Sequence, residues 1–282
     1  MNLKTALAEL SRKLQTAGVG MNDLEARYLL CEAANITQIQ LVTDGEHTLS
    51  ANGELRLGRM LQRRLKGEPL ARVLGHAEFW GLSLIVTPAV LDPRGDSETL
   101  IAAAIEIFAD RKAESLRILD LGTGSGALLC ALLSEFGNAT GVGVDVSEGA
   151  AKVARKNLAQ NGHSERGCIL VSNWADSLNG SFDLIVSNPP YIETDVISGL
   201  DVSVREFDPI LALDGGKDGY DCYRNIISAL PRLLKPGGWS ILEAGALQAE
   251  GISSLFGSHG SQPVLRFKDY GGHDRVIAAR FG

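Results

Sequence analysis

The sequence is poor in cysteine and in aromatic residues. Its 282 residues include 4 Cys, and only 6% of them are aromatic. The cysteines are far apart and follow none of the spacings typical of metal or redox sites. Cys130 and Cys168 stand in apolar surroundings and are therefore predicted to be small core residues. We expect no metal site.

Long apolar runs and an excess of positive charge are also lacking. No run approaches the ~18 apolar residues of a membrane span, and the first residues lack a signal-peptide core. This predicts a cytoplasmic protein with no membrane partner. The net charge of −7 disfavours a general electrostatic grip on a nucleic-acid backbone, so stable nucleic-acid binding is not expected.

The first 75 residues predict a small helical bundle. Apolar residues recur at helical spacing after Asn2, after a cap at Asn22 or Asp23, and after Ser50. The third of these stretches has a basic side, made of Arg56, Arg59, Arg63, Arg64 and Lys66. A solvated helix face explains this charge, and a docking surface for an acidic partner or an RNA is the alternative.

The residue pattern changes from helical to β-prone after this region. Residues 79–86 are bulky and β-prone, and Thr87-Pro88 breaks the pattern, which predicts a short β-hairpin between two domains. An apolar helix is expected from Leu100 to Phe108, with Asp96 or Ser97 as its cap.

A glycine-rich turn directly follows the predicted strand 117–121 and precedes a helix. The turn consists of Gly122, Thr123, Gly124, Ser125 and Gly126. This order lets the backbone approach a ligand closely. The spacing is not that of the dinucleotide fingerprint, and no Gly-Lys-Ser/Thr follows, so ATP chemistry is disfavoured.

The next two predicted strands end in residues suited to an adenosine. Asp145 follows strand 140–144 and can hold a ribose diol, although it can also cap a helix from Ser147. Trp174 follows the third strand and offers a plane for adenine, with Asn173 beside it for the edge of the base. The alternative for Trp174 is a packed core side chain.

The strand 182–186 ends in Ser187, Asn188, Pro189, Pro190 and Tyr191. The two prolines stiffen the loop and hold Asn188 at the strand tip. The Asn188 oxygen and the Pro189 carbonyl can both accept from a planar –NH₂ group, with Tyr191 as an aromatic wall. A capping turn with a packed tyrosine would explain the motif alone. Beside an adenosine site without a phosphate cradle, however, it indicates S-adenosylmethionine and N-methylation.

These motifs resemble those of a known family. Residues 120–126 resemble the first motif of class I methyltransferases, and residues 187–191 resemble the amino-methyltransferase motif. The whole chain resembles the bacterial protein-(glutamine-N5) methyltransferases that modify peptide chain release factors. The further matching stretches are 67–70, 78–81, Pro93-Arg94, 212–219, 235–238 and 268–276.

The resemblance implies an α/β fold, in which a class I Rossmann-like methyltransferase domain has a seven-stranded, mostly parallel sheet. It places this domain at residues 93–282, behind a helical substrate-recognition domain at 1–75 and a hairpin linker at 76–92. It implies transfer of methyl from S-adenosylmethionine, leaving S-adenosylhomocysteine, to the glutamine of a Gly-Gly-Gln tripeptide in class I release factors.

The strand ends described above and the resemblance together give the expected site residues. Asn188, Pro189 and Tyr191 are expected to act in catalysis and, with Pro190, to contact the substrate. The cofactor is expected to contact residues 122–126, Asp145, Asn173, Trp174 and Asn188. The chain departs from the family pattern at three positions, which are Gly95, Asn173 and Asp208.

Three alternatives remain at the level of sequence. The same clamp suits an exocyclic base amine of DNA or ribosomal RNA, against which stand the negative charge and the absence of a basic, aromatic-rich module. A ribosomal-protein glutamine is the second possible acceptor. The third alternative is a non-catalytic binding module that retains the fold.

Overall fold

The computed structural model describes residues 1–282. The chain forms two compact units, Met1–Gly75 and His76–Gly282. Each unit has its own hydrophobic core of buried side chains. None of the helices combines the length and the apolarity that a membrane span requires.

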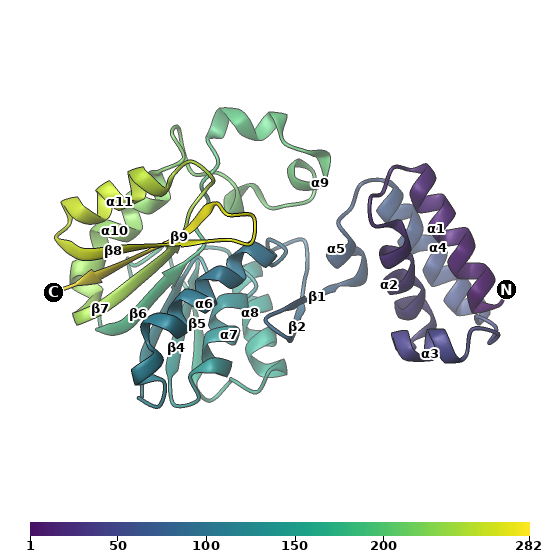
Figure 1. Ribbon diagram of the computed structural model, residues 1–282, viewed down its shortest axis with the longest axis horizontal. Helices are drawn as coiled ribbons and strands as arrows, with labels where there is room; N and C mark the ends of the chain where they lie inside the picture. Colours follow the sequence, from purple (N-terminus) through teal and green to yellow (C-terminus); the bar gives the residue numbers. More distant parts are fainter. The chain divides into compact units, whose positions relative to one another are not determined.

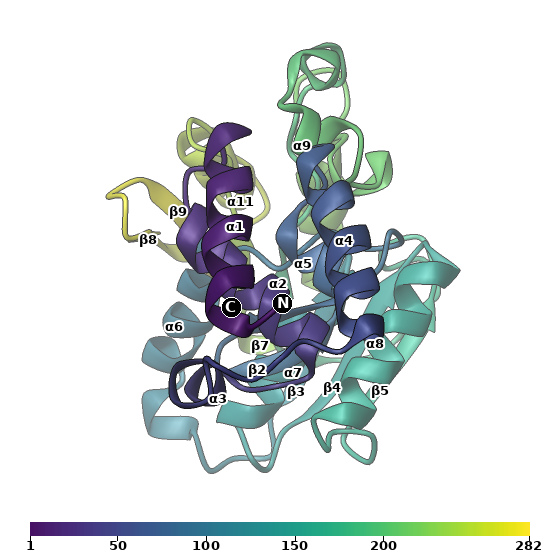
Figure 2. The ribbon, with the colours of Figure 1, turned by 90° about the vertical axis from the view of Figure 1, so that its right-hand side faces the viewer.

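The first unit is a bundle of helices (Figure 2). They are α1 (Leu3–Thr16), α2 (Asn22–Ala34), α3 (Gln38–Thr43), α4 (Ala51–Leu65) and α5 (Leu70–Leu74). Helix α2 packs against both α1 and α4, and Leu10 and Leu14 of the apolar stripe of α1 are buried. The expected cap of α2 is wrong: its N-cap is Met21, without a side-chain hydrogen bond, and the Asn22 amide donates to Ser11 instead.

Acidic partners neutralise much of the basic side of α4. Arg56 pairs with Glu32 at 3.0 Å, and Arg64 pairs with Glu25 at 2.6 Å. Arg63 forms a further pair, with Glu68. Each pair leaves less net positive charge on this helix than the sequence alone suggested.

The predicted hairpin is present at the start of the second unit. Strands β1 (His76–Phe79) and β2 (Leu82–Ile85) pair antiparallel. The buried Asn157 of α8 (Glu148–Gln160) fixes β2: its Oδ1 accepts from the Ile85 N–H at 2.7 Å, and its Nδ2 donates to the Ile85 carbonyl at 3.1 Å. The same amide donates to the Ser125 carbonyl at 2.8 Å. One side chain thus joins the hairpin to the glycine turn.

The second unit is built on a seven-stranded sheet of order β5-β4-β3-β6-β7-β9-β8. β3, β4, β5, β6 and β7 are parallel, and β9 is antiparallel to both of its neighbours. This confirms the predicted α/β fold with a mostly parallel sheet. The strands are β3 (Arg117–Leu121), β4 (Thr140–Asp145), β5 (Gly167–Val171), β6 (Phe182–Ser187), β7 (Leu234–Glu243), β8 (Ser261–Lys268) and β9 (Asp274–Phe281).

Helices cover both faces of this sheet (Figure 1). One face packs on α6 (Glu98–Ile107), α7 (Ala127–Glu135) and α8, and the other on α10 (Asp221–Leu233) and α11 (Ala249–Ser258). Neighbouring strand residues therefore enter different cores, as Leu184 and Ile185 do. The shorter helical segments are η1 (Gly95–Ser97), η2 (Ala109–Arg111), η3 (Thr194–Gly199), α9 (Val202–Arg205) and η4 (Ile210–Ala212).

The sheet edge explains one wrong prediction. Cys130 is buried in α7, as expected. Cys168, however, is exposed, because it lies on β5, which is an edge strand of the sheet. An apolar neighbourhood in the sequence does not reveal which strand lacks a covering neighbour.

Candidate active site

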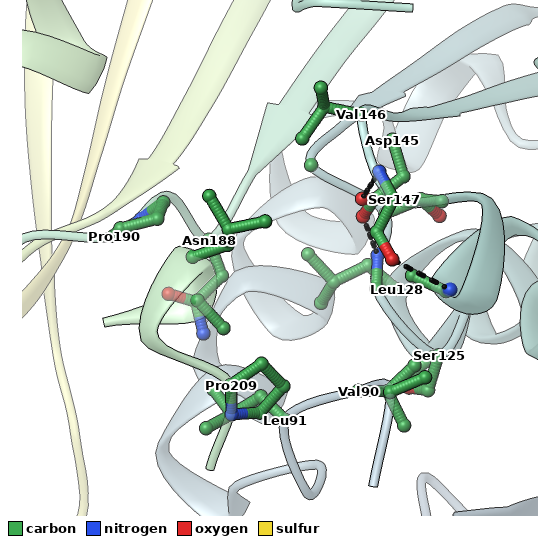
Figure 3. Close-up of a pocket in the computed structure, with 18 of the residues that line it drawn as sticks. Val90, Leu91, Ser125, Leu128, Asp145, Val146, Ser147, Asn188, Pro190 and Pro209 are labelled. Atoms are coloured by element: carbon green, nitrogen blue, oxygen red, sulfur yellow. Dashed lines mark hydrogen bonds between the residues drawn. The ribbon is translucent and has the colours of Figure 1, made fainter. Parts of the chain in front are cut away.

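A pocket of about 360 Å³ lies where four parallel strands end (Figure 3). The turn after β3, the tip of β4, the segment after β5 and the loop after β6 all contribute to its wall. Carboxyl ends of parallel strands are where open α/β sheets bind ligands. The predicted residues in the wall are Gly122, Thr123, Gly124, Ser125, Asp145, Asn173, Trp174, Asn188 and Pro190.

The glycine turn needs its glycines for close packing. Gly126 has φ +79°, and a Cβ there would lie 3.3 Å from the Cα of Ala154 in α8. Beneath the turn, the Thr123 hydroxyl donates to Asp120 Oδ2 at 2.6 Å. Burial raises the pKa of Asp120 to about 7. Gly126 itself is therefore a packing residue beneath the pocket wall.

Asp145 is held from two sides. Its Oδ2 accepts from the Gly124 N–H at 2.8 Å, and its Oδ1 accepts from the Ser147 N–H at 2.9 Å. The cap of α8 is Ser147, whose hydroxyl accepts from the Ala150 N–H. Because a carboxylate has about four acceptor positions, Asp145 retains capacity for two more hydrogen bonds on the pocket side.

Trp174 has an unusual backbone. Its φ of +43° is rare for a bulky side chain and costs on the order of 1–3 kcal/mol. The indole packs on the glycine turn: a Cβ on Gly122 would come within 3.3 Å of it. The Asn173 amide donates to Asp176 at 3.0 Å. Trp174 thus packs on the protein and also faces the pocket.

Asn188 directly follows β6 and lies across the pocket from Asp145 (Figure 3). Its Nδ2 donates to the Ser97 hydroxyl at 3.0 Å. No hydrogen bond within the protein uses its side-chain oxygen, which leaves that oxygen available as an acceptor. Pro190 shares the pocket wall, whereas Pro189 is buried and lies outside it.

The backbone of Tyr191 is held by its neighbours, and the residue lies outside the pocket wall. Its carbonyl accepts from Gln248 Nε2 at 3.1 Å, and a Cβ on Gly215 would come within 2.8 Å of its Cα. Burial, and then the charge of Glu243, raise the pKa of the Tyr191 hydroxyl. The phenol therefore stays protonated near neutral pH, as suits a packing wall.

Sequence reasoning missed the residues that support Asn188. Ser97 was expected to cap a helix, but no cap hydrogen bond uses its side chain. Its hydroxyl instead donates to Glu243 at 2.5 Å. Only the fold brings residues 97, 188 and 243 together, so no local motif could have revealed them. Pocket residues Val90, Leu91, Pro209 and Leu211 were missed for the same reason.

One departure from the family pattern has a partner in the structure. Arg94 pairs with the buried carboxylate of Asp208 at 2.8 Å. The pair joins the segment before η1 to the loop that carries Pro209, and both segments contribute to the pocket wall. Asp208, although shorter than a glutamate, thus still reaches Arg94.

The sheet order, the glycine turn and the pocket define a class I, Rossmann-like methyltransferase. Two family models match the chain, PrmC N-terminal domain at residues 5–75 and Methyltransferase small domain at residues 100–203. Release factor glutamine methyltransferase of Agrobacterium fabrum is 43% identical over 98% of this chain and 97% of its own length. The chain belongs to the release factor glutamine methyltransferase family.

One further relative belongs to the same family, and one solved structure shares the fold. Release factor glutamine methyltransferase of Geobacter sulfurreducens is 38% identical over 95% of this chain and 93% of its own length. A methyltransferase structure from Pyrococcus furiosus superposes with a TM-score of 0.52 at 19% identity and covers 83% of this chain and 100% of that chain. The latter likeness supports the fold alone.

Proposed function

We propose that this protein transfers a methyl group from S-adenosylmethionine to the side-chain nitrogen of the glutamine in the Gly-Gly-Gln motif of class I release factors. The observation that carries the proposal is one continuous pocket that runs from Asp145 to Asn188. It supplies an acid for a ribose at one side and an amide oxygen for an –NH₂ group at the other.

The pocket residues fit S-adenosylmethionine. Asp145 has two acceptor positions left for the ribose hydroxyls. Trp174 would cover the adenine, and Asn173 would face its edge. The turn 122–125 would lie against the cofactor with backbone atoms, since it carries few side-chain atoms there. When bound, the cofactor supplies a methyl group already activated by a sulfonium.

Asn188 and Pro189 would act on the acceptor amide. A glutamine nitrogen is a poor nucleophile because its lone pair is delocalised into the carbonyl. A hydrogen bond from one N–H group to the Asn188 oxygen would orient it and strengthen as positive charge develops. A second hydrogen bond, to the Pro189 carbonyl, stays a prediction from the sequence, because Pro189 lies outside the pocket wall. Pro190 and Tyr191 would hold this loop rigid. The main remaining task is to align the glutamine nitrogen with the methyl carbon at roughly 3–3.5 Å. The N–C bond would form as the S–C bond breaks, and the nitrogen would then lose one proton to solvent.

The alternative acceptors differ in what must enter the pocket. An exocyclic base amine fits the same oxygen, but a nucleic acid must also approach a chain of net charge −7. The basic helix α4 is largely paired with acids. A protein glutamine is therefore the better supported acceptor.

One labelling experiment tests the function. The purified protein is incubated with methyl-labelled S-adenosylmethionine and a purified class I release factor. A matched factor with Gln→Ala in its Gly-Gly-Gln motif is the control. We expect label only in the intact factor, located by mass spectrometry on that glutamine. Label in nuclease-sensitive material, or in a ribosomal protein instead, would overturn the proposal.

Asp145→Ala tests the cofactor end. Loss of hydrogen bonds to a charged group should weaken S-adenosylmethionine binding by roughly 1.5–3 kcal/mol, or about 10–150-fold in Kd. Ser147→Ala is the matched control, because it removes a helix cap beside the site and no proposed ribose contact. Calorimetry that gives both variants the wild-type Kd would remove Asp145 from the cofactor site.

A further inference from the structure

Three polar side chains from distant parts of the chain meet behind Asn188. Ser97 ends η1, Glu243 ends β7, and Asn188 follows β6. Asn188 Nδ2 donates to Ser97 Oγ at 3.0 Å, and Ser97 Oγ donates to Glu243 Oε2 at 2.5 Å. Glu243 is only 3% exposed and Ser97 only 4%. A carboxyl group is thus buried behind the pocket, one side chain removed from it.

The pairing of two neighbouring strands brings Asn188 and Glu243 together. β6 and β7 are adjacent and parallel, with Ser187 opposite Leu242. The next residues along the chain, Asn188 directly after β6 and Glu243 at the end of β7, therefore lie side by side. Loop rearrangement alone cannot separate them, because strand pairing fixes the register.

We propose that Glu243, acting through the Ser97 hydroxyl, fixes the orientation of the Asn188 amide so that its oxygen faces the acceptor nitrogen. An ionised carboxylate only accepts hydrogen bonds, so the single Ser97 proton must point to Glu243. Ser97 can then only accept from Asn188, and the –NH₂ end of the amide must face it. Glu243 is in this way a positioning residue, and its role rests on the proposed function.

Protonation of Glu243 would no longer force the Ser97 proton to point to Glu243. A neutral carboxyl can donate to Ser97, which frees the serine proton to point to an inverted Asn188 amide. Burial raises the pKa of Glu243 to about 7, so this change falls near neutral pH. Asp96 raises this pKa further, whereas the Ser97 hydrogen bond, Arg275 and the Asn188 amide lower it.

The charged neighbours come from several elements. Arg275 of β9 bonds Asp269 at 3.0 Å and lies 3.3 Å from Asp96 of η1. Tyr191 and Tyr223 are neutral neighbours, because burial raises the pKa of each hydroxyl. Arg275 is therefore the cation that faces Glu243, and its charge is shared with two other acids.

The test uses kinetics and three variants. Glu243→Gln keeps the shape but can donate to Ser97, so it removes the direction without opening a cavity. Ser97→Ala breaks the connection, and Ser97→Thr keeps the hydroxyl. We expect kcat on the release factor to fall about 10–100-fold in Glu243→Gln and Ser97→Ala, as for other residues that orient a functional group. Ser97→Thr should retain most of the activity, and the Kd for S-adenosylmethionine should change less than about twofold in all three.

The pH profile separates positioning from mere stability. The wild-type kcat should rise with pH through about 7 as Glu243 ionises, and Glu243→Gln should lack this rise. Suppose that the wild-type enzyme methylates its substrate and that Glu243→Gln has the same kcat and pH profile. That result would overturn this inference but not the proposed function. If the wild type fails to methylate any release factor, the proposed function fails and the kinetic role of Glu243 fails with it.

A spectroscopic readout does not depend on turnover. In protein labelled with [¹⁵N]asparagine, the side-chain –NH₂ signal that disappears in Asn188→Ala belongs to Asn188. We expect this signal to shift with a midpoint near pH 7 in the wild type and to be insensitive to pH in Glu243→Gln. An Asn188 signal that does not change between pH 5.5 and 8.5, spanning about 1.5 units on either side of that midpoint, would overturn the proposed orientation, whatever the enzyme methylates.

Discussion

Asn188 offers its side-chain oxygen to the pocket while its nitrogen is held by Ser97. We expect Asn188→Ala to lower kcat about 10²–10³-fold, the usual cost of one preorganised polar contact. Asn188→Asp should retain more activity, because a carboxylate still accepts hydrogen bonds, but less than the wild type, because it cannot donate to Ser97.

Single-turnover kinetics with a release factor would measure this effect, and calorimetry would measure the cofactor Kd beside it. The affinity for the cofactor should fall only slightly, since Asp145 and Trp174 remain. A near-normal kcat for Asn188→Ala would make Asn188 a capping residue and contradict the proposed mechanism.

Asp120 is a second residue whose burial has a measurable consequence. Burial raises its pKa from 3.8 to about 7 in the folded protein. Between these values the unfolded chain releases the proton and the folded chain keeps it. The free energy of unfolding should therefore fall as pH rises from about 4 to 7, and Glu243 should add a change of the same sign.

Asp120→Asn should flatten this dependence, because an amide does not titrate and still accepts from Thr123. We expect the loss of stability between pH 4 and 7 to shrink by roughly 1–4 kcal/mol. Urea unfolding at several pH values would measure it. An unchanged slope would mean that Asp120 is ionised in the folded protein throughout this range.

At the scale of elements, the Asn157 side chain joins β2 to the glycine turn through three hydrogen bonds to backbone groups. Asn157→Ala would leave these buried groups unpaired, at roughly 1–3 kcal/mol for each group that water cannot reach. We expect lower stability and weaker S-adenosylmethionine binding together. Asn161→Ala is the control, because Asn161 also bonds β2, at the Ser83 carbonyl, but from a more exposed position. Equal losses in the two variants would show that Asn157 is not a specific link to the pocket.

Periodicity and breakers were enough to predict the elements that matter for the site. The strand 182–186 and its Asn-Pro-Pro-Tyr end follow from a β-branched run stopped by two prolines. The glycine turn follows from its place between a strand and a helix. These are local features, and local sequence contains the information for them.

The residues that were missed act through contacts between distant elements. Glu243 is the last residue of β7 and belongs to no motif that the sequence marks, and Ser97 looks like a cap. Their importance arises only when β7 pairs with β6 and η1 packs over both strand ends. Cys168 was misjudged because the order of strands in the sheet, and hence its edge, is a property of the whole fold.

At the scale of the molecule, the pocket is built entirely by the second unit, from Phe79 to Cys222. The first unit has a separate core. We therefore expect residues 76–282 to bind S-adenosylmethionine with a Kd within about twofold of the full chain. The KM for an intact release factor should rise at least about tenfold, as expected when remote binding energy is lost.

A short Gly-Gly-Gln peptide is the matched substrate control. Both forms of the enzyme should use it equally, because it reaches only the pocket. If the truncated enzyme methylates the intact factor as well as the full chain does, the first unit has a role other than substrate recognition. Steady-state kinetics on the two substrates would decide this, with circular dichroism to verify that the shortened chain is folded.

The order β4-β3-β6 has a final consequence for which molecules can react. Asp145 and Asn188 leave strands that are separated by one other strand, which sets them about two strand spacings, or ~10 Å, apart. Hydrogen-bonded pairing fixes the distance between these two strands, so small loop changes cannot lengthen it by part of a strand spacing. A cofactor homologue with one extra methylene between ribose and sulfur should still occupy the ribose site, yet carry its methyl past the nitrogen held by Asn188. Such a compound would be an inhibitor rather than a donor.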